Sequence, residues 1–199
     1  MKGWWGKTLP YASLEEKASG LRVKRALIGL WILLVLACFS DIVSSVLVAH
    51  NVENILAMGY VDRLFETNPT LAPDEMNPVV YLRPKLPLLA GASGLVALAV
   101  WKLQAIARSD NLQFQTRLLA FHLLWLALSI HMAGLNNFSL YFLGDSPFHM
   151  LRRAIEAAYG APLARATIYY MNGGIAISLS MGAAALFFVR YPLFRRIPR

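Results

Sequence analysis

The sequence contains a single cysteine and few charged residues. Cys38 is the only cysteine in the 199 residues, so no internal disulfide is possible. It lies within an apolar run, where a free thiol behaves as a small hydrophobic side chain. Charged residues make up 15% of the chain, compared with about 25% in soluble domains. This shortage favours an integral membrane protein over a soluble domain with a large core.

Acidic residues are also scarce, since 11 of them stand against 19 lysines and arginines. A basic balance is typical of nucleic-acid-binding proteins, but here the positive charges lie at the ends of apolar segments. That placement suits membrane orientation better. We therefore expect contact with membrane lipid and no nucleic-acid partner.

Hydrophobic residues make up 57% of the chain and gather in long runs. The clearest run, residues 24–50, begins with two cations and carries one carboxylate, Asp41, deep inside it. A spanning helix needs about 20 mostly apolar residues. The pattern predicts an all-α membrane protein, a bundle of four transmembrane helices over residues 25–49, 86–107, 115–134 and 167–189.

The remaining segments divide the chain into three parts: a basic, interfacial leader at residues 1–23, the transmembrane domain at 24–190, and a basic tail at 191–199. Within the domain, 50–84 and 136–165 are expected to be the outer loops. Residues 147–159, with Ser146 as the N-cap, and residues 55–65 are predicted to form short interfacial helices.

Lysine and arginine counts predict the orientation. With the N-terminus in the cytoplasm, the inner segments hold 13 of these residues and the outer loops hold six. This bias favours a multi-pass protein of the cell (cytoplasmic or inner) membrane with both termini cytoplasmic.

Small residues predict where the helices pack closely. Gly174, Ser178 and Gly182 recur at a spacing of four in the last predicted helix, which lets another backbone approach. Gly91 and Gly94 offer the same in the second helix. In the third helix, His122 lies near the estimated level of Ser180, and we expect it to make an interhelical hydrogen bond.

A polar layer is predicted in the outer half of the bundle. The helical rise per residue places Asp41, His131 and Asn172 at nearly one level, with Asp41 roughly 22 Å from the inner face. Polar groups in lipid seek one another because hydrocarbon offers them no partner. The residues expected around a polar cavity that opens outward are Asp41, Ser44, Ser45, Glu75, Asn77, His131 and Asn172.

Three interpretations of this cavity remain open. Asp41, Glu75 and His131 could ligate a metal ion that activates water for hydrolysis, although the sequence lacks an H-E-x-x-H motif. Asp41 and His131 could instead carry protons or ions. The structural alternative is that Asp41 pairs with His131, Asn172 or Lys85 and stabilises the bundle. The residue pattern identifies no particular cofactor.

Arg152 and Arg153 lie in the predicted outer amphipathic segment. Together with Glu156 they are expected to form its water-facing side. The alternative is that the two arginines bind a lipid phosphate.

Two short motifs resemble a known group. Asp41-x-x-Ser44 in the first helix and Glu75-x-Asn77-Pro78 before the second resemble an uncharacterised group of small bacterial four-helix membrane proteins, which carry D-x-x-[ST] and E-x-N-P at these places. The gap between Asp41 and Glu75 is longer here than in that group. The resemblance implies the same fold and singles out Asp41, Glu75 and Asn77, but it brings no activity with it.

These features favour a non-catalytic membrane protein, such as a small subunit or accessory of a larger assembly. The expected partner is another membrane protein or further copies of the chain. The alternatives are a metal-dependent membrane hydrolase and a proton- or ion-coupled transporter, both using the cavity around Asp41 and His131.

Overall fold

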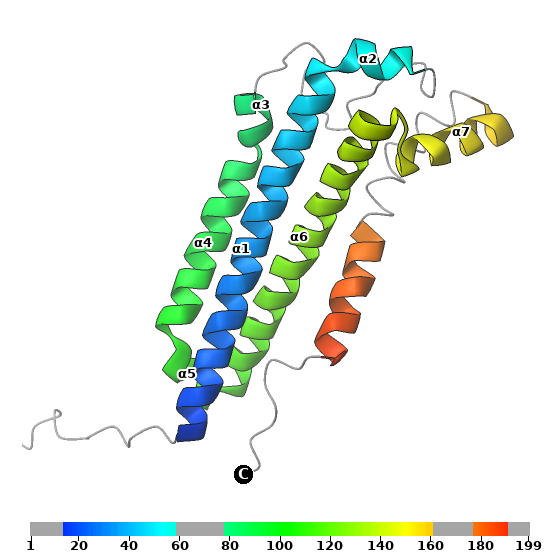
Figure 1. Ribbon diagram of the computed structural model, residues 1–199. Coiled ribbons are helices and arrows are strands. Elements are labelled where there is room, and N and C mark those ends of the chain that lie inside the picture. The colour runs from blue at the N-terminus through cyan, green and yellow to red at the C-terminus, as the bar shows by residue number, and fades with distance from the viewer. Residues whose placement is uncertain (1–13, 59–77, 161–176, 191–199) are drawn as a thin grey trace, which may run out of the picture.

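The computed structural model describes residues 14–58, 78–160 and 177–190. These residues are almost entirely helical and contain no strand. Figure 1 shows long helices side by side, in the order α4, α1, α6 and then the unlabelled helix at Ile177–Arg190. The helices are α1 (Leu14–His50), α2 (Val52–Ala57), α3 (Pro78–Leu82), α4 (Lys85–Trp101), α5 (Leu103–Arg108), α6 (Asp110–Leu143) and α7 (Pro147–Tyr159).

Two helices are long and apolar enough to cross a membrane, α1 from Gly20 onward and the whole of α6. The absence of strands from the described residues confirms the predicted all-helical class. The shorter apolar helices, α4 and Ile177–Arg190, fall below the length of a full span in the described part of the chain.

Contacts between side chains establish the direction of each helix. Along α1 and α4, Asp41 meets Lys85 and Trp31 meets Ser93, so the two helices are antiparallel. α1 and α6 run parallel, because Gly134 lies against Asp41 and, farther along both helices, Asn137 bonds to Ser45.

The helix at 177–190 runs antiparallel to α6. Trp125 contacts Ile177, and Phe121, one turn earlier on α6, contacts Phe188. In Figure 1 the first residues of α1 and the last residues of this helix consequently lie at the same end of the bundle.

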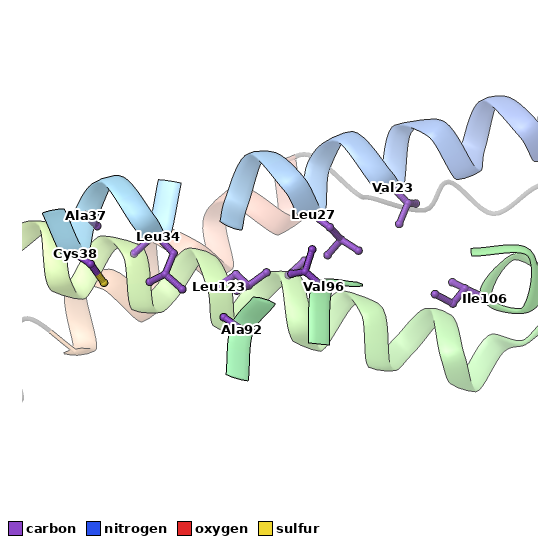
Figure 2. Close-up of a cluster of buried hydrophobic side chains, with 11 residues drawn as sticks. Val23, Leu27, Leu34, Ala37, Cys38, Ala92, Val96, Ile106 and Leu123 are labelled. Carbon is purple, nitrogen blue, oxygen red and sulfur yellow. The ribbon is translucent and has the colours of Figure 1, made fainter. Parts of the chain in front are cut away.

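The core is apolar and centres on α1. Val23, Leu27, Leu34, Ala37 and Cys38 of α1 are almost fully buried. They form one cluster with buried residues of three other helices: Ala92, Val96, Ile106, Ala120, Leu123 and Ala127. Figure 2 labels four of these, Ala92, Val96, Ile106 and Leu123. Cys38 is a free thiol within this cluster, as expected for a small hydrophobic residue.

The helices differ in length from the predicted spans. The first helix starts at Leu14, before the predicted span at 25–49. The second is interrupted, because α4 ends at Trp101 and Lys102 separates it from α5. The third begins at Asp110 and continues to Leu143 instead of ending at Gly134.

The extension of α6 has a physical cause in the tertiary structure. Asn136 and Asn137 suggested a loop because asparagine is common in turns. In the folded chain Asn137 Nδ2 donates to Ser45 Oγ at 3.1 Å, and Asn136 Oδ1 accepts from the Phe148 backbone N–H at 3.3 Å. Both asparagines therefore have partners outside their own turn, and the helix continues through them.

Other local predictions agree with the structure. The outer amphipathic helix spans Pro147–Tyr159, and Ser146 caps it by accepting from the His149 backbone N–H. The short helix expected over 55–65 differs in its bounds: α2 spans Val52–Ala57, and residues 59–65 lie outside the described residues. Of the last predicted helix, 167–189, the structure describes the portion from Ile177 onward.

Candidate functional site

The carboxylate of Asp41 forms an ion pair with Lys85. Asp41 Oδ2 lies 2.8 Å from Lys85 Nζ, and each side chain is 14% exposed. Lys85 is the first residue of α4, and its ammonium group also donates to the backbone carbonyl of Tyr81 on α3, at 3.2 Å. Three partners were expected for Asp41, and the structure pairs it with Lys85. The pair joins the last third of α1 to the start of α4.

The serines that follow Asp41 have separate partners. Ser44 is completely buried, and its Oγ donates to the backbone carbonyl of Asp41 at 3.0 Å rather than to the carboxylate. Ser45 accepts from Asn137 of α6. The serines of the predicted cavity therefore tie α1 to itself and to α6, while the carboxylate faces α4.

A glycine that the sequence analysis did not single out brings α6 close to this pair. A Cβ on Gly134 would lie 3.1 Å from Ser40 Oγ and 3.3 Å from both Cα and N of Asp41. A side chain at this position would require Ser40 or the backbone at Asp41 to move by a few tenths of an ångström, so glycine favours this close approach. Its spacing gave no signal, because Gly134 does not belong to a small-xxx-small series like the one around Gly182.

His131 does not join the pair. Its side chain is exposed on α6, and no ion pair forms between it and Asp41, both of which are described. Glu75, Asn77 and Asn172 lie outside the described residues. Within 14–58, 78–160 and 177–190, no three histidines, cysteines or carboxylates are grouped as a metal site would require.

Of the two predicted lipid-binding arginines, Arg153 forms an ion pair within the protein. Arg153 pairs with Asp145, which precedes α7 and is 9% exposed at its side chain. Asp145 also accepts from the Ser146 backbone N–H at 2.8 Å. Arg153 therefore helps to hold the start of α7. The side chain of Arg152 lies outside the described residues.

A second polar contact joins α6 to the helix at 177–190. Ser129 Oγ and Ser180 Oγ are 2.6 Å apart, and Trp125 Nε1 donates to the Ile177 carbonyl at 3.2 Å. The prediction for His122 is wrong, since its Nδ1 lies 2.7 Å from the Leu118 carbonyl in its own helix and the side chain is exposed. Ser180 is instead paired with Ser129, which lies about two turns beyond His122 on α6.

The arrangement has a clear chemical character. An aspartate bonded to a lysine is neutral as a pair, which lowers the cost of holding both groups away from water. The carboxylate is already engaged by an ammonium group and has no described histidine beside it. The described contact is therefore an ion pair between two helices.

Comparison with other proteins returns no relative. No protein-family model, curated protein or solved structure matches the chain.

Proposed function

We propose that the chain is a multi-pass protein of the cell membrane, with four spanning helices and both ends on the cytoplasmic side. It acts without catalysis, as a small subunit or accessory of a larger membrane assembly. The observation that carries this proposal is the Asp41–Lys85 pair, which uses the one carboxylate of the first apolar run to join two helices.

The exposed surface supports a lipid environment. Large apolar side chains on every long helix face outward, including Phe39, Trp101, Phe142, Leu186 and Val189, with exposures from 65% to 81%. Most residues in the apolar windows of α1 and α6 are not buried by the chain. A core helix of a soluble protein buries such residues, whereas a spanning helix presents them to acyl chains.

The heights of the helices support four spans. Asp41 is level with Lys85 and next to Gly134, and Ser129 is level with Ser180. We measured height along each helix from these contacts, at about 1.5 Å per residue, toward the end where α1 begins. Four basic residues then lie within about 5 Å of one level. They are Arg25, Lys102, Arg117 and Arg190.

A shared level of cations at one end of every long helix is what the positive-inside rule requires at the cytoplasmic face. The hydrocarbon core then begins near residue 26 of α1. At a thickness of about 30 Å, it ends near residue 46 of α1 and residue 140 of α6. The Asp41–Lys85 pair lies roughly 7 Å below that outer boundary, where an unpaired charge is costly.

An assembly partner is supported by what the helices leave uncovered. No atom of the described residues lies within 4 Å of a Cβ placed on Gly182, so another helix can approach it. Aromatic and small residues on the outer surfaces suit contact with lipid and with a second membrane protein.

The test compares the wild-type protein with a variant in which the pair is replaced by apolar residues of similar size, Asp41→Leu with Lys85→Met. Both are purified in mild detergent, and their mass and stoichiometric partners are determined by light scattering and mass spectrometry. We expect the wild type to carry a stoichiometric partner or to be a defined oligomer, and the double variant to keep it. A solitary wild-type monomer contradicts the accessory role.

The same two proteins, reconstituted in vesicles, distinguish the transporter. Proton or ion flux in the wild type that disappears in a folded double variant would overturn the proposal. Stoichiometric metal in the purified wild type, with stability that falls in chelator, would favour the hydrolase instead.

A further inference from the structure

Helix α7 leaves the bundle at a sharp elbow. α6 ends at Gly144, whose φ of 69° is in the left-handed region, and the Gly144 N–H donates to the Leu140 carbonyl at 2.9 Å. α7 begins three residues later, at Pro147. Figure 1 shows that it points across the direction of the long helices rather than along it.

Buried polar contacts hold this elbow in place. Asp145 and Ser146 are 8% and 1% exposed. Asp145 pairs with Arg153, two turns into α7, while Ser146 Oγ caps the helix and lies 3.0 Å from His149 Nδ1. From the other side, Asn136 of α6 accepts the Phe148 N–H. The angle between α6 and α7 is therefore built into both helices.

The surface of α7 is divided into two faces. At about 100° per residue, Leu151, Ala154 and Ala158 share the centre of a wide apolar face, with Met150 at its edge. The opposite face carries Glu156, with His149 and Arg153 beside it. Leu151 is half-buried, whereas Met150 is 56% exposed and both alanines are also exposed, so the chain covers this face only in part.

The apolar surface continues from α6. Phe142 and Leu143, the last residues of α6, are 67% and 66% exposed immediately before the elbow. If α6 leaves the hydrocarbon core near residue 140, the start of α7 lies only a few ångströms above the boundary, by about 1.5 Å per residue. Interfacial helices bury their apolar face at this depth, between headgroups and acyl chains.

From this geometry we propose that α7 lies flat in the outer leaflet of the membrane, with its partner the glycerol and upper acyl region of phospholipid. Ala154 and Ala158 face the acyl chains, and Glu156 faces water. The inference rests on the spans of the proposed function, because they set the height and direction of α6. The elbow at Asp145 holds the helix in this plane.

The experiment uses a fluorescent NBD group on single cysteines in the full chain, with Cys38→Ala as the background. The positions are Ala154→Cys on the apolar face, Glu156→Cys on the polar face, and Leu135→Cys, which is 51% exposed on α6. Each protein is reconstituted in phosphatidylcholine vesicles. Quenching is measured with nitroxide-labelled lipid and, separately, with aqueous iodide.

We expect the label at 154 to be quenched by the lipid nitroxide almost as strongly as the label at 135. Iodide is expected to quench the label at 156 at least threefold more than the label at 154. Adding Asp145→Ala removes the ion pair with Arg153. The difference in iodide quenching between the labels at 154 and 156 is then expected to shrink. Ala158→Cys repeats the measurement at a second position on the apolar face.

Two results would overturn the inference. Only the second would also overturn the membrane spans of the proposed function. If 135 is lipid-quenched while 154 and 156 are equally open to iodide, α7 stands in water and the spans survive. If 135 itself is open to iodide and not quenched by lipid, the spans of the proposed function fail, and the placement of α7 fails with them.

Discussion

α6 packs against a helix on each of two sides, and the two contacts are built differently. Toward α1, the buried apolar cluster lies at the centre, and Gly134 lets the backbones approach next to Asp41. Toward the helix at 177–190, the contact includes a serine pair and a tryptophan–carbonyl bond, together with the Phe121–Phe188 ring contact.

Burial follows the same division. In the described part of the last helix, Ser180 and Ala184 are buried, while Leu186 and Val189 are 72% and 81% exposed. Close packing of small residues contributes dispersion along the whole contact, whereas a hydrogen bond between membrane helices contributes little on average. We therefore expect α1, α4 and α6 to form the stable unit and the last helix to add less.

The largest effect is expected when one member of the ion pair is removed. Asp41→Ala leaves the largely buried Lys85 ammonium without its carboxylate partner. It should reduce the free energy of unfolding by about 3 kcal/mol, as for other buried pairs. Unfolding is followed by circular dichroism as sodium dodecyl sulfate is added to protein in mild detergent.

The control is the double variant Asp41→Leu with Lys85→Met, which removes both charges. It should recover most of the lost stability, because no unpaired charge remains. A double variant as unstable as Asp41→Ala would mean that packing around Asp41, rather than charge, makes the contact.

The next effect comes from the close approach of α1 and α6. Gly134→Leu forces a side chain against Ser40 and the backbone of Asp41, and overpacking of this kind should cost about 2 kcal/mol. Gly182→Leu is the matched control, since the space around that glycine is open. Both variants are measured by the same unfolding assay. Equal losses of unfolding free energy would contradict the view that α6 packs more closely against α1 than against the last helix.

A smaller effect is expected at the other side of α6. Ser129→Ala and Ser180→Ala each remove one half of the hydroxyl pair. A double-mutant cycle should give a coupling of about 0.6 kcal/mol, the average for hydrogen bonds between membrane helices. A coupling as large as the loss at Asp41 would place the last helix within the stable unit.

The smallest effect is expected at His131, which the sequence analysis placed with Asp41. Its side chain is exposed and makes no ion pair with Asp41. His131→Ala should change the unfolding free energy by less than about 0.5 kcal/mol, as for other exposed positions. A loss comparable to that of Asp41→Ala would show that the histidine belongs to the polar site after all.

Part of the site could be predicted because charges in apolar runs have few possible partners. Asp41 is the only carboxylate of the first run, and Lys85 precedes the second, so their pairing was among the expected alternatives. Ser146 could be recognised as a cap because a serine before an amphipathic segment is a local signal. Gly134 could not, since a single glycine in a helix carries no information about which face meets a neighbour.

The sequence by itself determined the helical class, the apolar character of the long helices and the scarcity of charge within them, because these depend on composition and on patterns within one helix. Only the tertiary structure decided that Asp41 turns to α4 and that Gly134 rather than Gly182 lies at the closest approach. It also decided that α6 continues through Asn136 and Asn137. These outcomes depend on which faces of separate helices meet, and that is settled by the packing of residues far apart in the chain.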